Sequence, residues 1–182
     1  MARNKEVNRL VKRRRIKNTI TTIIMLAGVL LGYNIMNRGI LGKAEVSGSS
    51  MEPTYYDYDE SIFSRIAEPE RGDVVIFDMD GTTIIKRLIA KGGDTVKIVR
   101  DEKTGLCKVI LNGKELYEPY IVEGWTNSGY YENEEIKLKE NEYFLMGDHR
   151  EVSKDSRVVG PFTRDQYIGT VIFDTKKTSH PN

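Results

Sequence analysis

The feature that most constrains this chain is an apolar segment of twenty residues, 18–37, which contains no charged side chain. As an α-helix rising 1.5 Å per residue it would be about 30 Å long, which matches the hydrocarbon core of a bilayer. Thr21, Thr22 and Asn34 give the segment a high polar content for such a span. It still predicts one transmembrane helix, with a cleavable signal peptide and a buried core helix as the alternatives.

The charge on the two sides of this segment is uneven. Residues 1–18 contain eight Lys or Arg and one Glu, a net charge of +7, whereas the rest of the chain has 20 basic and 26 acidic residues, a net charge of −6. The positive-inside rule then places the N-terminus in the cytoplasm and the body outside the cell. A basic tail can also bind nucleic acid, but its position before an apolar span favours membrane lipid. We therefore expect a cytoplasmic tail over 1–17, a membrane helix over 18–37 and an extracytoplasmic domain over 38–182.

The body of the chain has the pattern of a mainly β protein. Short runs of alternating polarity, such as DTVKIV, KVILNG and EYFLMG, are separated by glycine-rich turn signals. Asn112-Gly113 predicts a hairpin turn, and a short helix is possible near residues 164–167. Cys107 is the sole cysteine, which excludes an intramolecular disulfide. The expected fold is an antiparallel β-sheet domain.

The segment VSGSSMEPT, residues 46–54, offers Ser50 as a nucleophile. A serine hydroxyl reacts poorly at neutral pH unless a base lies within hydrogen-bond reach and donors stabilise the oxyanion. Since Pro53 restricts the residue before it, we expect a strand through Ser50 that places Ala44, Val46, Gly48 and Ser50 on one face. The same letters also suit a Ser/Gly-rich linker next to the membrane.

The base has few candidates. His149 and His180 are the only histidines, and His180 stands close to the end of the sequence. Lys86 lies within TTIIKRLIA, a run that predicts a strand, and a neutral lysine amine can replace imidazole. Its pKa must fall from about 10.4 to near 7, which corresponds to about 4 kcal/mol and is within reach of burial. Ile84 and Leu88 share its strand face, and Met51 is a further residue that can cover it.

Four segments in order carry a resemblance to a known family. The chain resembles the bacterial type I signal peptidases, membrane-anchored proteases with a Ser-Lys dyad, and in particular their short Gram-positive-like form. The resemblance rests on GSSMEPT at 48–54, RGDVVIF at 71–77, IIKRLIAKGGD at 84–94 and GDHREVSKDSRVVG at 147–160. One departure is Gly92-Gly93 where the family commonly has Pro-Gly.

The resemblance implies a role for several residues. Ser50 would be the nucleophile, Lys86 the base, Ser153 a hydrogen-bond partner that orients the lysine, and Asp155 with Arg157 a structural ion pair. His149 stands where the family often has asparagine, so it is expected outside the dyad. Gly48 stands where some members carry a serine oxyanion donor, which leaves this role to the backbone N–H of Ser50. The short segment 97–142 implies a reduced second β subdomain.

The implied activity is cleavage of N-terminal signal peptides from exported preproteins at the cell membrane. Such substrates present small residues one and three positions before the scissile bond. An extended peptide of this kind can add as a strand beside Ser50 and Lys86, with alternate side chains in shallow apolar pockets. The candidates for lining these pockets are Val46, Met51, Ile84 and Ile85. Neither a metal nor another cofactor is expected, and the expected partners are preproteins and membrane lipid, with no nucleic acid.

Two other functions remain to be tested. VVIFDMDGTT, residues 74–83, matches the first motif of haloacid-dehalogenase-like phosphatases, in which Asp78 would attack phosphate, Asp80 would act as acid/base and Mg²⁺ would bind. That fold needs a parallel sheet with crossover helices, whereas a simple hairpin turn explains the same letters. The other alternative is a membrane-tethered binding or adhesion module without chemistry.

Overall fold

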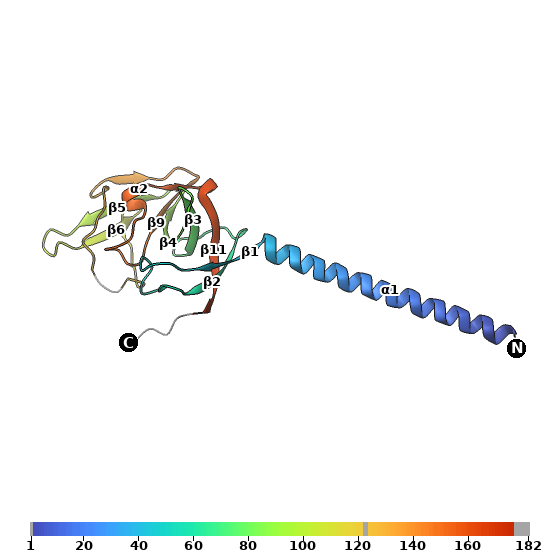
Figure 1. The fold of residues 1–182 in the computed structure, drawn as a ribbon. Coiled ribbons are helices and arrows are strands. Elements are labelled where there is room, and N and C mark those ends of the chain that lie inside the picture. Colours follow the sequence, from blue (N-terminus) through green and yellow to red (C-terminus); the bar gives the residue numbers. More distant parts are fainter. Residues whose placement is uncertain (1, 122–123, 177–182) are drawn as a thin grey trace. The chain divides into compact units, whose positions relative to one another are not determined.

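The computed structural model describes residues 2–121 and 124–176 (Figure 1). The chain divides into two compact units, Met1–Leu41 and Gly42–Asn182. The first unit is formed by α1, Ala2–Gly39, a helix of 38 residues. The helix therefore covers the predicted apolar span and also continues through the basic residues that precede it.

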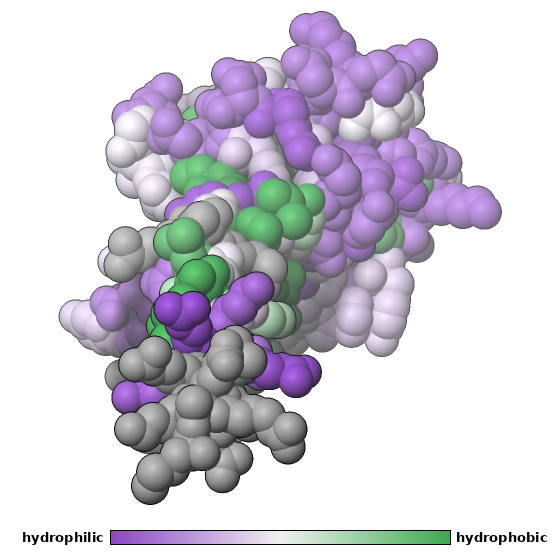
Figure 2. All heavy atoms as spheres, turned by 90° about the vertical axis from the view of Figure 1, so that its right-hand side faces the viewer, coloured by the Kyte–Doolittle hydropathy of each residue, from purple (hydrophilic) through white to green (hydrophobic). Residues whose placement is uncertain are grey.

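Within α1, Lys12–Asn34 is a stretch of 23 residues with a mean hydropathy of 1.4 and no buried residue. Among the described residues, α1 is the one helix long and apolar enough to cross a membrane. Figure 2 shows apolar side chains, in green, at the surface among hydrophilic ones in purple. The threonines in this stretch bond to the preceding turn, since Thr21 Oγ1 donates to the Lys17 carbonyl at 2.9 Å and Thr22 Oγ1 to that of Asn18 at 3.0 Å. These bonds satisfy the hydroxyls inside an apolar segment.

The larger unit is built on a seven-stranded sheet with the order β1-β2-β11-β3-β4-β9-β10. Every pairing for which the register is given in this sheet is antiparallel. The mainly antiparallel β fold predicted from the sequence is therefore confirmed. The strands are β1 Leu41–Glu45, β2 Glu60–Ser64, β3 Val74–Met79, β4 Thr82–Lys91, β9 Glu142–Met146, β10 Phe162–Thr163 and β11 Tyr167–Lys176.

A second, four-stranded sheet lies between β4 and β9 in the sequence, in the order β7-β6-β5-β8. It overlaps the segment 97–142 that was expected to form a reduced β subdomain. Its strands are β5 Thr95–Arg100, β6 Cys107–Leu111, β7 Lys114–Glu115 and β8 Glu135–Lys137. Two short helical turns complete the unit, α2 Ser156–Val159 and a 3-10 turn, Arg164–Gln166, in the region where a short helix was expected.

Two hairpins follow directly from their turn residues. Asn112 and Gly113 have φ of 50° and 78° and join β6 to β7, which confirms the predicted Asn-Gly turn. Asp80 and Gly81 have φ of 53° and 83° and join β3 to β4 in the same way. The DMDGTT letters therefore form a hairpin between antiparallel strands, not the strand-to-helix connection of a phosphatase fold.

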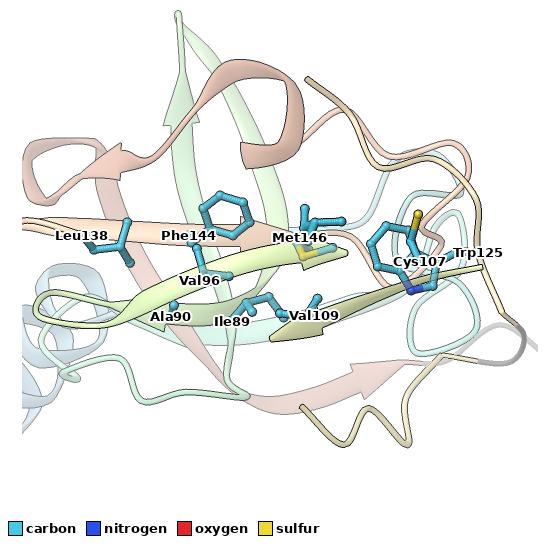
Figure 3. Close-up of a cluster of buried hydrophobic side chains, with 10 residues drawn as sticks. Ile89, Ala90, Val96, Cys107, Val109, Trp125, Leu138, Phe144 and Met146 are labelled. Atoms are coloured by element: carbon cyan, nitrogen blue, oxygen red, sulfur yellow. The ribbon is translucent and has the colours of Figure 1, made fainter. Parts of the chain in front are cut away.

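The largest core cluster packs the two sheets against each other. Figure 3 shows these side chains, which come from β4 and β9 on one side and from β5, β6 and the following loops on the other. Its buried members are Ile89, Ala90, Val96, Ile98, Cys107, Val109, Trp125, Leu138, Phe144 and Met146. Because side chains alternate along a strand, Leu88 and Leu145 enter a different cluster with Val75, Phe77 and Phe162. Lys86 therefore lies in the middle of β4, where the half of the strand that is buried on both faces begins.

The strand predicted through Ser50 is wrong. β1 ends at Glu45, and the residues around Ser50 form turns closed by the bonds Glu52 N–Ser49 O at 3.1 Å and Tyr55 N–Met51 O at 2.9 Å. Gly48 has a φ of 83°, which departs from strand geometry, and its N–H donates to Asp57 Oδ1. The Ser50 carbonyl accepts from the His149 N–H at 3.1 Å, so a distant loop holds this turn in place.

Candidate active site

Ser50 and Lys86 meet in the structure. The Lys86 Nζ donates to Ser50 Oγ at 2.8 Å and to the Ile85 carbonyl at 2.8 Å. Lys86 reaches this place from β4, and Ser50 from the turn that follows β1. The distance lies within the range expected of a nucleophile and its base.

The environment of Lys86 favours the neutral amine. Lys86 is 5% exposed, although its side chain carries an ionisable group. Burial lowers the pKa of Lys86 from 10.5 to about 8, and the nearby carboxylates of Asp155 and Asp148 oppose this shift, while Arg157 adds to it. Desolvation therefore dominates, as a lysine that acts as a base requires.

The loop after β9 lies beside this pair and is held by a buried ion pair. Asp155 accepts from Arg157 Nη2 at 2.8 Å and from Arg157 Nε at 2.8 Å, and both side chains are buried. Asp155 also accepts from the Gly147 N–H at 2.9 Å and caps α2 through the Arg157 N–H. The two residues expected to form a structural pair are thus brought together, and they close the loop from 147 to 157 on itself.

Ser153 lies in the same loop, but the hydrogen bond expected between it and Lys86 is not formed. Its Oγ is buried and has no hydrogen-bond partner among the described residues. Gly147 separates it from the nucleophile, because a Cβ built on Gly147 would lie 2.3 Å from Ser153 Oγ and 2.4 Å from the Ser50 carbonyl oxygen. Only glycine allows these two segments to approach so closely at this point.

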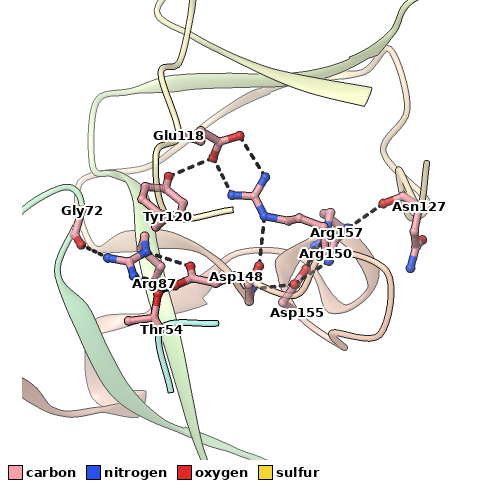
Figure 4. A network of polar contacts seen from close by, with 11 residues as sticks. Thr54, Gly72, Arg87, Glu118, Tyr120, Asn127, Asp148, Arg150, Asp155 and Arg157 are labelled. Carbon is pink, nitrogen blue, oxygen red and sulfur yellow. Dashed lines mark hydrogen bonds and ion pairs between the residues drawn. The ribbon is translucent and has the colours of Figure 1, made fainter. Parts of the chain in front are cut away.

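A second buried ion pair was missed by the sequence analysis. Arg87 directly follows Lys86 on β4 and points to the other face of the strand, where it binds Asp148 through Nε and Nη2. Asp148 Oδ2 also accepts from the Thr54 hydroxyl, and Arg87 Nη1 donates to the Gly72 carbonyl at 2.6 Å. Figure 4 shows this network. Arg87 is a charged residue inside the apolar run IIKRLIA, and this is the sequence feature that could have predicted a buried ion pair.

This network ties the nucleophile segment to the lysine strand and continues toward the smaller sheet. Thr54 lies four residues after Ser50, and Arg87 one residue after Lys86, so both dyad candidates have a neighbour in one cluster. In Figure 4, Arg150 lies next to this cluster and binds Glu118, while the Arg87 guanidinium lies 4.1 Å from the centre of the Tyr120 ring. The relative position of the two segments is therefore fixed by buried charge pairs as well as by packing.

A cavity of about 380 Å³ opens beside the Ser50–Lys86 pair. It is lined by Ala44, Glu45, Ser47, Ser50, Ile76, Met79, Thr82, Thr83, Ile84, Ile85, Lys86 and Lys154. Ile84 and Ile85 thus lie where a substrate-binding role was expected. Val46 and Met51 are 3% and 0% exposed and belong to a core cluster with Tyr55 and Val74, so the structure places them behind the cavity lining.

Among the described residues, the side chains of His149 and Asp78 have partners other than Ser50 Oγ and Lys86 Nζ. His149 Nδ1 lies 3.2 Å from the Ser49 carbonyl, and the side chain is 39% exposed. His180 lies outside the described residues. Asp78 accepts from the Gly81 N–H within its own hairpin. In the part of the chain that the structure describes, no group of three or more His, Cys, Asp or Glu could hold a metal ion.

Comparison with known proteins gives a consistent picture. Residues 15–175 match the family model described as signal peptidase, peptidase S26. The chain is 34% identical over 140 residues to signal peptidase I S of Bacillus subtilis, covering 70% of this chain and 73% of the relative. It is 30% identical over 177 residues to signal peptidase I U of the same organism, covering 88% of each. A solved signal peptidase I from Enterococcus faecalis V583 matches 59% of this chain and 99% of its own at 25% identity, with a TM-score of 0.46.

These findings define a class and then a family. The mainly antiparallel β fold and the match to the peptidase model place the chain among the serine endopeptidases, which are hydrolases. The family model covers most of the chain, and relatives at 30% identity or more cover over two thirds of it. The chain belongs to the signal peptidase family, peptidase S26.

Proposed function

We propose that this protein is a membrane-anchored serine endopeptidase that removes N-terminal signal peptides from exported preproteins by means of a Ser50–Lys86 dyad. The observation that carries the proposal is the 2.8 Å contact between Ser50 Oγ and the amine of a 5% exposed lysine. An exposed lysine at the same distance would remain protonated at neutral pH and could not accept the serine proton.

The reaction follows from this geometry. Ser50 Oγ attacks the scissile carbonyl carbon, and Lys86 accepts the hydroxyl proton as the new C–O bond forms. Lys86 then gives the proton to the leaving amine as the C–N bond breaks, which leaves an acyl-enzyme on Ser50. A water molecule, deprotonated by the same amine, attacks the ester carbonyl. The bond between the acyl carbon and Ser50 Oγ breaks, Lys86 returns the proton to Ser50 Oγ, and the signal peptide leaves with a new carboxylate. Each step uses groups of this chain and water.

The developing oxyanion needs a donor that is free to reach it. The Gly48 N–H is already bonded to Asp57 Oδ1, and Gly48 has no hydroxyl to offer. The Ser50 N–H has no hydrogen-bond partner among the residues that the structure describes. We assign the oxyanion donor to this N–H.

The substrate path follows two strand edges. β1 is the end strand of its sheet, and β4 pairs with β9 only from Arg87 to Lys91, so residues 82–86 have a sheet neighbour on one side only. Both edges line the cavity beside Ser50. An extended peptide between them gains backbone hydrogen bonds, while Ile84 and Ile85 offer apolar contacts that suit small side chains one and three positions before the scissile bond.

The proposed function also includes anchoring of the chain in the membrane. Residues 18–37 would span the bilayer as part of α1, with the basic tail 1–17 in the cytoplasm and the domain 38–182 outside, since Lys and Arg concentrate before the span. Membrane lipid and preproteins are then the partners. Neither nucleic acid nor a cofactor has a role in this scheme.

The test is cleavage of a preprotein with a small-x-small site by the full chain in detergent and in lipid vesicles. Mapped cleavage after that site is expected for the wild type, and its loss in Ser50→Ala and Lys86→Ala with folding kept. Lys91→Ala is a matched control, because Lys91 lies on the same strand and pairs with Glu70 away from the cavity. Cleavage should also survive a chelator. Retained cleavage by Ser50→Ala would refute the dyad. A folded wild type without cleavage would refute the proposed activity and leave the binding-module hypothesis.

A further inference from the structure

The active-site cavity carries two charged side chains that the proposed reaction does not use. Apart from Lys86, its ionisable lining residues are Glu45, from β1, and Lys154, from the loop after β9. Neither forms an ion pair with any described residue, and both are exposed. The cavity therefore presents one negative and one positive charge to whatever occupies it.

The backbone of Lys154 is held firmly although its side chain is exposed. Its neighbours are Ser153, buried against Gly147, and Asp155, buried in the ion pair with Arg157. The ammonium is therefore carried by a fixed point of the loop, and only its own side chain has to be ordered on binding a ligand.

The elements that line the cavity indicate which part of the substrate lies near Lys154. In the proposed binding mode, the residues from β1 and from the β3–β4 hairpin hold the part of the substrate before the scissile bond. Lys154 is the single lining residue contributed by the loop after β9, and this loop contacts the nucleophile turn through the bond from His149 N to the Ser50 carbonyl. Lys154 therefore borders the cavity beside the nucleophile, on a wall that the proposed path of the residues before the scissile bond does not use.

We infer that Lys154 forms a subsite that attracts a carboxylate on the first or second residue after the scissile bond. The inference rests on the proposed function and adds a specificity to it: preproteins whose mature part begins with Asp or Glu are cleaved in preference to those that begin with Lys or Arg. The ligand chemistry is that of a side-chain carboxylate paired with an unpartnered ammonium at a partly solvated site. Such a pair gives a modest increase in kcat/KM, which falls as the salt concentration rises.

The experiment compares preprotein substrates that differ only at the first two positions after the scissile bond, with Asp, Asn or Lys at each. The ratio of kcat/KM for Asp over Lys is measured for the full chain in detergent at low salt. We expect a ratio of about three to ten for the wild type, on the scale of partly exposed charge pairs. Lys154→Gln should bring the ratio close to one, Lys154→Glu should invert it, and Lys154→Arg should preserve it.

The control is Lys114→Gln, the same change at an exposed lysine of the smaller sheet that does not line the cavity. This variant should keep the wild-type ratio, and high salt should reduce the wild-type ratio toward one. An unchanged ratio in Lys154→Gln, or a preference confined to positions before the scissile bond, would overturn the inference while cleavage itself continues. Absence of cleavage from every substrate would instead refute the proposed function.

Discussion

The amine of Lys86 lies 2.8 Å from the hydroxyl of Ser50, although the two residues are 36 positions apart and lie in different elements. Lys86 is fixed by a strand with neighbours on both of its faces, and Ser50 by a turn whose carbonyl is held by His149 N. Their contact therefore depends on the alignment of the β4 strand with the nucleophile turn.

The first prediction concerns pH. Because burial holds the pKa of Lys86 at about 8, about one amine in ten is neutral at pH 7, and cleavage requires the neutral form. We expect kcat/KM to rise about tenfold between pH 7 and a plateau above about pH 9. The measurement is a pH profile of kcat/KM with a substrate that has no ionisable group near the scissile bond. A flat profile over this interval would contradict the assignment of Lys86 as the base.

The second prediction is that the dyad lysine lowers the stability of the fold. A pKa that falls from 10.5 unfolded to about 8 folded means that the unfolded chain binds more protons between these values. The buried ammonium therefore lowers the free energy of unfolding of the wild type by its full amount below pH 8. This destabilisation disappears as the pH rises toward 10.5. Lys86→Met should raise the free energy of unfolding at pH 7 by about 3 kcal/mol while abolishing cleavage.

Denaturant unfolding followed by the fluorescence of Trp125, the sole tryptophan and a buried one, measures this difference. The gain should shrink between pH 8 and pH 10. An equal gain at both pH values would show that the effect comes from packing and not from the charge.

The third prediction separates buried from exposed ion pairs. Asp148→Asn should cost about 3 to 5 kcal/mol, because it leaves the buried guanidinium of Arg87 without its charged partner. The matched control is Glu68→Gln, which breaks an exposed ion pair. The side chain of Glu68 is 73% exposed and that of its partner Arg164 is 40% exposed. That change should cost less than about 1 kcal/mol. Equal costs for the two variants would argue against a structural role for the Arg87 network.

The fourth prediction concerns the close approach at Gly147. Gly147→Ala would place a methyl group 2.3 Å from Ser153 Oγ and 2.4 Å from the Ser50 carbonyl oxygen, so the nucleophile turn must shift. We expect a loss of about 1 to 3 kcal/mol of stability and a fall in kcat/KM of at least tenfold. Gly28→Ala in α1, where nothing lies within 4 Å of the new methyl group, should leave cleavage unchanged. Wild-type activity in Gly147→Ala would show that the turn tolerates displacement.

The fifth prediction tests Ser153, whose buried hydroxyl has no partner among the described residues. Ser153→Ala removes an unsatisfied polar group, so stability should stay the same or rise by about 1 kcal/mol. If the hydroxyl turns to Lys86 during the reaction, as the family resemblance implies, kcat/KM should fall and its pH profile should move. A change in stability alone, with the same pH profile, would restrict Ser153 to a packing role.

Several features of this protein follow from its sequence because they depend on local chemistry. The long uncharged segment predicts a helix that can span a bilayer, alternation of polarity predicts strands, and Asn112-Gly113 predicts its turn through the positive φ that both residues adopt. The pairing of Asp155 with Arg157 is also close in sequence. The segment around Ser50, the apolar run around Lys86 and the family resemblance together predict Ser50 and Lys86 as nucleophile and base.

Other features were decided only by the tertiary structure. A turn forms at Ser50 in place of the expected strand, and the Ser50 carbonyl accepts a hydrogen bond from the His149 N–H. These residues are 99 positions apart, so no local sequence pattern predicts their contact. The Arg87–Asp148 pair joins residues 61 apart, and the missing Ser153 bond depends on how one loop packs against another. Long-range packing sets desolvation, and desolvation sets the pKa of Lys86. The sequence therefore predicts which residues form the dyad, whereas the neutral state that lets Lys86 act as a base depends on burial in the folded chain.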